Sequence, residues 1–275
     1  LIDAKAELNA VDKDGDTALI LAALKGHVEC LELLLDAKAD IGAVNKNGDT
    51  ALIRAALEGH IECVQVLIDA KASINTLGKA GNNAVIHAAA EGHLECLRLL
   101  LAAKANIEAQ NEHGVTALIL AATGDETECL QMVLEAKADI DVETKNGDTA
   151  LIMATDRGHA ACLRLLIDAK ASVNIASNDG AFPLEIAAEM GHTDCLQMLL
   201  EAKADIDMAN TSGSTALMEA AWCGHVLCLQ LLTDAKANVH ATDKESATAL
   251  MDAATMGQTN CLKVLMDAKA DLEAV

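Results

Sequence analysis

Aromatic residues, proline and long apolar runs are scarce in this sequence. Its 275 residues include one Trp, one Phe, one Pro and no Tyr, although 52% of them are hydrophobic. The core must therefore be built from aliphatic side chains. No apolar run approaches the roughly 18 residues that a membrane-spanning helix needs, and no segment has the basic start and apolar centre of a signal peptide. Direct membrane insertion is not expected.

Motifs that hold metals, phosphates or dinucleotides are missing as well. The sequence contains no C-x-x-C, no H-E-x-x-H, no G-x-x-x-x-G-K and no G-x-G-x-x-G, which are the spacings that those ligands require. His87 and Glu91 share a helix face, but a metal site needs a third ligand. We therefore expect no enzyme activity, no metal and no cofactor.

Positive charge is in short supply. There are 20 Lys and Arg residues against 42 Asp and Glu residues, which gives a net charge of −22. Such a field repels phosphate backbones, so nucleic acid is excluded as a partner. The same field favours a protein partner with a basic segment.

What the chain does have is a strict period of 33 residues without insertion or deletion. One Cys recurs in every period: Cys30, Cys63, Cys96, Cys129, Cys162, Cys195, Cys228 and Cys261. One Lys recurs in the same register: Lys5, Lys38, Lys71, Lys104, Lys137, Lys170, Lys203, Lys236 and Lys269. A period of this length predicts a stack of identical helical units rather than a globule with one central core.

The period also predicts the domain organisation. Residues 1–11 form a partial repeat and residues 12–275 form eight full repeats, so we expect one continuous domain over residues 1–275. The chain starts and stops at the same phase of the repeat. We therefore expect it to be part of a longer protein or complex.

The segment from Asn45 to Ile74 illustrates one repeat. A turn at 45–48 precedes Thr50, a good helix N-cap, and a short helix follows over 51–57. Gly59 ends this helix, since glycine tolerates the left-handed conformation. A second helix runs from His60 to about residue 70. Helices of two to three turns do not persist alone, so stability must come from stacking.

This repeat resembles the ankyrin repeat, and the resemblance extends over the whole chain. The residues that carry it here are Gly48-Asp49-Thr50-Ala51-Leu52, Ala55-Ala56, Gly59-His60, Leu67-Ile68 and Ala72-Ser73-Ile74. The resemblance implies an all-α solenoid of helix-turn-helix units with projecting hairpin fingers. It also implies a non-catalytic scaffold that binds other proteins through a concave face lined by the fingers and first helices.

The chain departs from the family pattern at three places. A Lys stands where the family has the Gly that ends the second helix, and only Pro183 keeps the proline that opens the first helix. The first-helix His of the family is replaced by Ile20, Ile53, Ile86, Ile119, Ile152, Glu185, Met218 and Met251. In the fourth repeat, Gly124-Asp125-Glu126 interrupts the Gly-His pair, and we expect the turn there to be rebuilt.

The cysteine series predicts free thiols. Stacked helices lie about 8–10 Å apart, too far for neighbouring members to form disulfides. Eight free and buried thiols indicate a reducing, intracellular compartment, either cytoplasmic or nuclear. Cys223 stands outside the series and is expected to be more exposed.

The positions that vary between repeats predict where a partner binds. The sixth to eighth repeats combine apolar and acidic residues at first-helix positions, a pattern that suits a basic and partly apolar segment. The predicted groove residues are Met153, Glu185, Ile186, Glu189, Met190, Glu219, Trp222, Cys223, Asp252 and Met256. A competing interpretation is that Trp222 simply packs over the next repeat near Thr255.

Three hypotheses about function remain open on the sequence. The first is a protein-interaction scaffold that binds its partner on the concave face. The second is a structural spacer or subunit of a larger assembly. The third is the regulatory array of an enzyme or channel whose working domain lies outside this sequence.

Overall fold

A computed structural model describes residues 7–268, so Lys5 and Lys269 lie outside the described residues. Within them the chain forms sixteen α-helices and no strand, apart from isolated bridges between Val11 and Thr17 and between Ala209 and Thr215. The chain divides into an N-terminal unit (Leu1–Asp139) and a C-terminal unit (Ile140–Val275), and each is described by itself.

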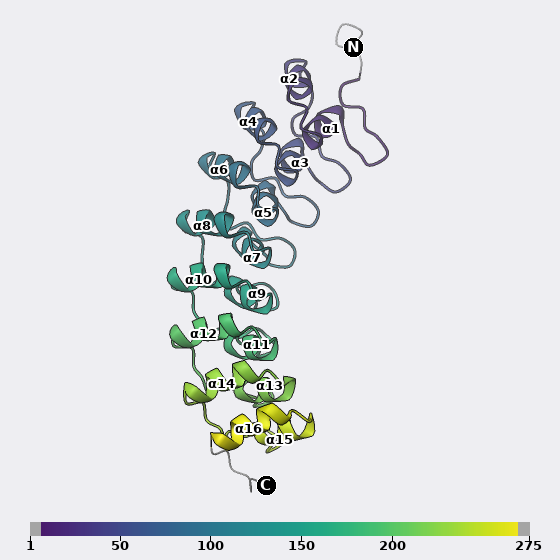
Figure 1. Ribbon diagram of the computed structural model, residues 1–275. Coiled ribbons are helices and arrows are strands. Elements are labelled where there is room, and N and C mark those ends of the chain that lie inside the picture. Colours follow the sequence, from purple (N-terminus) through teal and green to yellow (C-terminus); the bar gives the residue numbers. More distant parts are fainter. Residues whose placement is uncertain (1–6, 269–275) are drawn as a thin grey trace. The chain divides into compact units, whose positions relative to one another are not determined.

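The N-terminal unit is a two-layer stack of helix pairs (Figure 1). The first helix of each repeat packs on the first helix of the next, in the order α1, α3, α5 and α7, and the second helices α2, α4, α6 and α8 do the same. Their bounds are Ala18–Leu24 (α1), Val28–Asp36 (α2), Ala51–Leu57 (α3), Ile61–Asp69 (α4), Ala84–Ala90 (α5), Leu94–Ala102 (α6), Ala117–Thr123 (α7) and Thr127–Glu135 (α8).

The C-terminal unit repeats this arrangement. First helices α9, α11, α13 and α15 form one layer, and second helices α10, α12, α14 and α16 form the other. Their bounds are Ala150–Asp156 (α9), Ala160–Asp168 (α10), Pro183–Glu189 (α11), Thr193–Glu201 (α12), Ala216–Cys223 (α13), Val226–Asp234 (α14), Ala249–Thr255 (α15) and Thr259–Asp267 (α16). The predicted all-α repeat solenoid is confirmed.

Local chemistry explains the repeating helix pair. The Thr50 hydroxyl accepts a hydrogen bond from the Ile53 N–H at 3.3 Å and so caps α3. Gly59 follows with φ +73° and turns the chain into α4. Ala55 and Ala56 are fully buried, and their small side chains let the first helices of successive repeats approach closely.

A lysine in a strained backbone conformation follows the second helices. After α2, the Lys38 N–H bonds the Leu35 carbonyl at 2.9 Å and the Ala39 N–H bonds the Leu34 carbonyl at 3.0 Å, the two bonds of a Schellman motif. Lys38 itself has φ +68°, a conformation that normally selects glycine. The same left-handed backbone recurs at Lys71, Lys104, Lys137, Lys170, Lys203 and Lys236. The chain thus keeps the glycine geometry without the glycine.

The turn of the fourth repeat is not rebuilt, so that prediction is wrong. Asp125 takes φ +61°, and the Glu126 N–H bonds the Ala121 carbonyl at 2.9 Å. In the second repeat the His60 N–H makes the equivalent bond to Ala55, also at 2.9 Å. Aspartate tolerates the left-handed region better than most residues, which lets this turn keep its usual path.

Side-chain amides link some successive fingers. Asn45 Nδ2 donates to Asp16 Oδ1 at 2.8 Å, and Asn111 Nδ2 donates to Asn82 Oδ1 at 3.0 Å. Both bonds join residues that are 29 apart, so they are one repeating contact. In two other finger contacts this bond cannot form. Gly78 occupies the donor position opposite Asp49, and Ala181 occupies the acceptor position opposite Asn210.

Candidate functional site

Five of the ten predicted groove residues are exposed in the C-terminal unit. They cluster where the first helices end and turn toward the second. Met190, Trp222 and Met256 are 46%, 43% and 45% exposed, and Glu189 and Cys223 are exposed as well. For Trp222, this exposure leaves a large part of the indole free to contact a partner.

Two predicted groove residues are buried, which corrects their expected place on the surface. Glu185 is 4% exposed and Ile186 is 7% exposed. Both lie on α11, which packs between α9 and α13, and this packing covers them. Met153, Glu219 and Asp252 are half-buried. The accessible part of the predicted groove is therefore the row of first-helix ends.

At one position of this row, three consecutive repeats carry an apolar residue where earlier repeats carry a charged or small one. Met190, Cys223 and Met256 stand one residue before the glycine that separates the helices. Earlier repeats carry Lys25, Glu58, Glu91, Gly124 and Arg157 at the equivalent position. We call Met190, Trp222, Cys223 and Met256, with Glu189, Glu219 and Asp252, the acidic–apolar strip.

The carboxylates of the strip have no cation beside them on the first helices. Helices α11, α13 and α15 contain no Lys or Arg. Burial raises the pKa of Glu219, with the charge of Glu189 acting in the same direction. Burial also raises the pKa of Asp252 to about 6, with a smaller contribution from Asp243. The strip is thus a region of uncompensated negative charge.

Glu185 lies on α11 and links the start of its own helix to the next finger. Its carboxylate accepts a hydrogen bond from the Phe182 N–H at 3.2 Å, and its other oxygen accepts one from Asn210 Nδ2. Burial raises the pKa of this carboxyl to about 7, although both hydrogen bonds oppose the shift. Five other repeats place an isoleucine at this position, so Glu185 is a charged group in a core environment.

The exposed thiol of the strip is not set up for nucleophilic chemistry. Burial of the sulfur and the charges of Glu189 and Glu219 raise the pKa of Cys223. The thiolate is the reactive form of cysteine, so Cys223 is protonated at neutral pH. Its contribution to the strip is apolar and polarizable surface.

Three histidines of the series have a structural role. His60 Nε2, His93 Nε2 and His192 Nε2 each lie 3.0–3.1 Å from a carbonyl oxygen at the end of the preceding repeat's first helix. Gln258 Nε2 donates to the Trp222 carbonyl in the same way at 3.3 Å. These side chains satisfy helix-end carbonyls that would otherwise lack a partner.

The cysteine series is buried at seven of its eight positions, but Cys30 is exposed. Cys228 Sγ lies 3.6 Å from Thr193 Oγ1 of α12, in the repeat before it. Among the described residues, no helix pair precedes the pair α1 and α2 that contains Cys30. Burial raises the pKa of Cys96, Cys129 and Cys195 to about 11.

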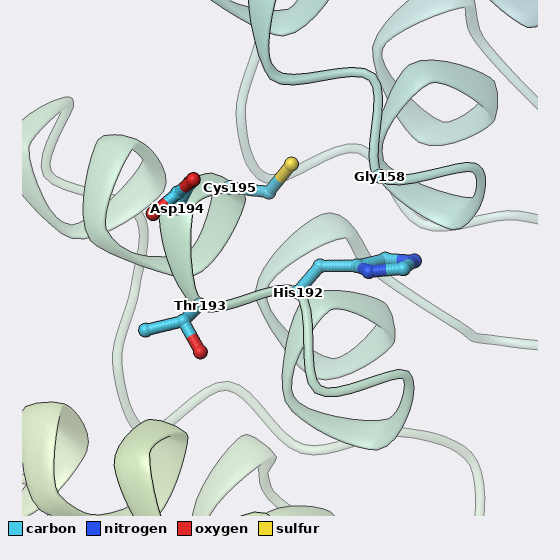
Figure 2. Close-up of a pocket in the computed structure, with 5 residues that line it drawn as sticks. All are labelled: Gly158, His192, Thr193, Asp194 and Cys195. Carbon is cyan, nitrogen blue, oxygen red and sulfur yellow. The ribbon is translucent and has the colours of Figure 1, made fainter.

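A polar hollow of about 270 Å³ opens at the start of α12 (Figure 2). It is lined by Gly158, His192, Thr193, Asp194 and Cys195. Figure 2 shows the His192 ring beside Gly158. Since His192 Nε2 is paired with the Asp156 carbonyl and the Cys195 thiol has a pKa of about 11, the hollow offers no activated nucleophile. Among the described residues, no group of three or more His, Cys, Asp and Glu side chains could hold a metal ion.

Sequence reasoning missed Leu227, which is 65% exposed at the start of α14. The equivalent position is acidic in five of the seven other repeats: Glu29, Glu62, Glu95, Glu128 and Asp194. The break in the period was the available signal. Leu227 gives the second helix of the seventh repeat an exposed apolar residue of its own.

No described helix is long and apolar enough to cross a membrane.

Comparisons with known proteins agree with this architecture. A family model described as ankyrin repeats (3 copies) matches residues 1–78, 74–144, 126–210 and 203–275. The crystal structure of the human ASB11 ankyrin repeat domain is similar, with a TM-score of 0.68 and 26% sequence identity over 74% of this chain and 90% of that chain. No curated protein matches the chain. Ankyrin repeats are generally protein–protein interaction scaffolds and typically non-catalytic. Since the family matches together span residues 1–275, the chain belongs to the ankyrin-repeat family.

Proposed function

We propose that this protein is a non-catalytic interaction scaffold that binds a basic, partly apolar protein segment on the acidic–apolar strip, on the face that the family resemblance makes concave. The observation that carries the proposal is the change from charged or small to exposed apolar residues at one repeating position. Three successive repeats replace charged or small residues by exposed Met190, Cys223 and Met256, beside the exposed Trp222.

The chemistry of the strip supports this class of partner. Tryptophan is enriched in binding hot spots, and methionine adapts its shape to different partners. The carboxylates of Glu189, Glu219 and Asp252 surround these side chains without a Lys or Arg on the same helices. A segment that brings its own cations would satisfy them, and its apolar side chains would cover Trp222 and the two methionines.

The test is loss of partner capture without loss of fold. Trp222→Ala with Glu189→Lys removes the aromatic anchor and reverses one charge. Both side chains are exposed, so the melting curve should stay nearly unchanged. A matched control is Leu33→Ala with Glu32→Lys on α2, which changes an exposed apolar residue and an exposed acid elsewhere. Affinity purification should recover the partner with the wild type and the control but not with the strip variant. Recovery with all three would refute the proposal.

We also propose that the protein works in a reducing compartment, either cytoplasmic or nuclear. All nine cysteines are free thiols in the described residues, and seven of them are buried between repeats. Free thiols in this number are typical of proteins that are not exposed to an oxidising environment.

A further inference from the structure

The fingers of the N-terminal unit carry a second period-breaking surface. Val11, Val44 and Leu77 occupy equivalent positions on three successive fingers and are 62%, 51% and 50% exposed. Two residues further along each finger stands an exposed lysine, at Lys13, Lys46 and Lys79. We call these six residues the finger strip.

Hydrogen bonds join the three fingers into one surface. The Lys46 N–H donates to the Asp14 carbonyl at 3.0 Å, and the Lys79 N–H donates to the Asn47 carbonyl at 2.7 Å. Lys46 Nζ also donates to the Lys13 carbonyl at 2.6 Å. The strip is therefore held by backbone contacts rather than by three independent loops.

The second and third fingers of the strip are cationic in a protein of strongly negative charge. Residues 43–48 and 76–81 of these fingers contain no acid, and Asp49 is buried. The first finger differs, because Lys13 stands between two exposed acids, Asp12 and Asp14. The positive charge of the finger strip therefore comes from Lys46 and Lys79, and the first finger contributes Val11 as apolar surface.

Later fingers do not carry this combination. The two equivalent positions are Gln110 and Glu112, Glu143 and Lys145, Ala176 and Asn178, Ala209 and Thr211, and Thr242 and Lys244. An exposed aliphatic residue paired with a lysine is thus confined to three neighbouring fingers of the N-terminal unit. It is a local feature and not a property of the repeat.

We propose that the finger strip of one chain docks on the acidic–apolar strip of a second copy, so that the protein associates head to tail. The proposal rests on the proposed function, since it names the basic, partly apolar surface that the acidic–apolar strip binds. The two strips are complementary in charge, lysines against carboxylates, and each supplies apolar side chains to cover the other.

The shared period favours a second copy over an unrelated segment. The apolar residues Val11, Val44 and Leu77 of the finger strip come from three consecutive repeats, and so do Met190, Cys223 and Met256 of the acidic–apolar strip. Both rows therefore repeat once per stacked repeat. Val11, Val44 and Leu77 can then oppose Met190, Cys223 and Met256 in register. An unrelated partner would need to reproduce that spacing independently.

The contact joins two different surfaces, which makes it heterologous. Such contacts leave one free strip of each kind at the ends of every open assembly and therefore produce chains or closed rings. The net charge of −22 per copy opposes association at long range. At about 0.15 M salt the screening length is about 8 Å, so most of that long-range repulsion is screened.

Two variants that each lose one strip test the proposal. Val44→Asp with Lys79→Glu changes the finger strip at exposed side chains, and Trp222→Ala with Glu189→Lys changes the other strip. In sedimentation velocity at about 0.15 M salt, the wild type should form concentration-dependent oligomers. Each variant alone should associate about tenfold or more weakly. Thermal melts confirm that both variants remain folded.

Mixing the two variants provides the decisive measurement. Each retains the strip that the other lacks, so an equimolar mixture should give a one-to-one dimer and nothing larger. Leu33→Ala with Glu32→Lys is the control and should associate like the wild type. A wild type that stays monomeric up to millimolar concentration, or a mixture that stays monomeric, overturns the proposal. The proposed function would survive that result, because it fails only if the Trp222 and Glu189 variant still captures a partner.

Discussion

Two finger contacts have lost their amide hydrogen bond in opposite ways. In the N-terminal unit Gly78 replaces the donor, and the Asp49 carboxylate is met instead by Arg54 Nη1 at 3.6 Å. In the C-terminal unit Ala181 replaces the acceptor, and the Asn210 amide donates instead to Glu185. In each case the replacing side chain lies on the first helix that follows the acceptor position: Arg54 on α3 follows Asp49, and Glu185 on α11 follows Ala181.

The two replacements differ in charge balance. Arg54 brings a cation to an acid, and its side chain is 21% exposed. Glu185 brings an acid to a neutral amide and is almost fully buried, so its charge has no counterion in that bond. A lost donor was replaced by an ion pair, whereas a lost acceptor left a carboxylate in the core. The second solution makes stability depend on pH.

The largest expected effect is this pH dependence. The pKa of Glu185 rises from an ordinary value of 4.5 to about 7 on folding. The folded state therefore holds this proton more tightly, and its stabilisation is fully present below about pH 4.5 and lost as the pH rises through 7. At about 1.4 kcal/mol per pKa unit, the loss is about 3 kcal/mol. The urea midpoint should fall between pH 5 and pH 8.

Two variants separate Glu185 from the other acids. Glu185→Gln removes the titration and should flatten most of the pH dependence. Glu185→Ile with Ala181→Asp restores the arrangement seen around Asp16 and Asn45, and it should also raise the urea midpoint at pH 8. A wild-type midpoint that is constant or rises between pH 5 and pH 8 would contradict the assignment.

A smaller effect is expected at the finger contact in which Gly78 replaces the amide donor. Arg54→Leu removes the cation beside the buried Asp49 carboxylate and should cost about 1–2 kcal/mol in the free energy of unfolding. Adding Gly78→Asn should recover most of this loss, since it restores the amide donor. A Cβ at Gly78 would lie 2.7 Å from Asp49 Oδ1, so that side chain must shift. Gly78→Ala in the same background is the control, because it adds carbon without a donor and should not recover stability.

The fold could be predicted because every level of the sequence repeats with one period. Thr50, Gly59 and the Ala55-Ala56 pair each have a local reason for their place, and the same reasons recur in neighbouring repeats. The expected helix over 51–57 is confirmed, and the second helix spans Ile61–Asp69. The turn at Asp125 was mispredicted because the pattern showed the missing Gly-His pair but not that aspartate can replace the glycine.

The depth of each site residue could not be read from the period. Ile186, Glu219 and Asp252 occupy equivalent positions, yet Ile186 is buried and the two acids are half-buried. Cys30 is equivalent to seven buried cysteines and is exposed. Burial at these positions depends on the neighbouring repeat as well as on the repeat itself. The period identified which residues break the pattern, and packing decides which of them reach the surface.

A modest and equal effect is expected at the lysine before each altered finger. Lys71 and Lys170 have φ +67° and +74°, and they precede the fingers that contain Gly78 and Ala181. Lys71→Gly and Lys170→Gly should each raise the free energy of unfolding by up to about 1 kcal/mol, because glycine has no Cβ to strain. Equal gains in urea titrations would show that the strain at this lysine is the same in both regions, unlike their finger contacts. A clear loss of stability would mean that the lysine makes a contribution that glycine lacks.

The smallest perturbation is chemical labelling, which compares one exposed thiol in each unit. Cys30 and Cys223 are exposed and the other seven cysteines are buried. A thiol-specific reagent should modify two cysteines in the folded protein and all nine in urea. Cys223 should react slowly for an exposed thiol, because burial of its sulfur and the nearby Glu189 and Glu219 raise its pKa and reduce the thiolate fraction. Glu189→Gln should therefore speed labelling of Cys223 and leave Cys30 unchanged. If Cys223 labels at the same rate with and without Glu189, the carboxylates of the strip do not act on it, and the description of the strip as uncompensated negative charge is wrong.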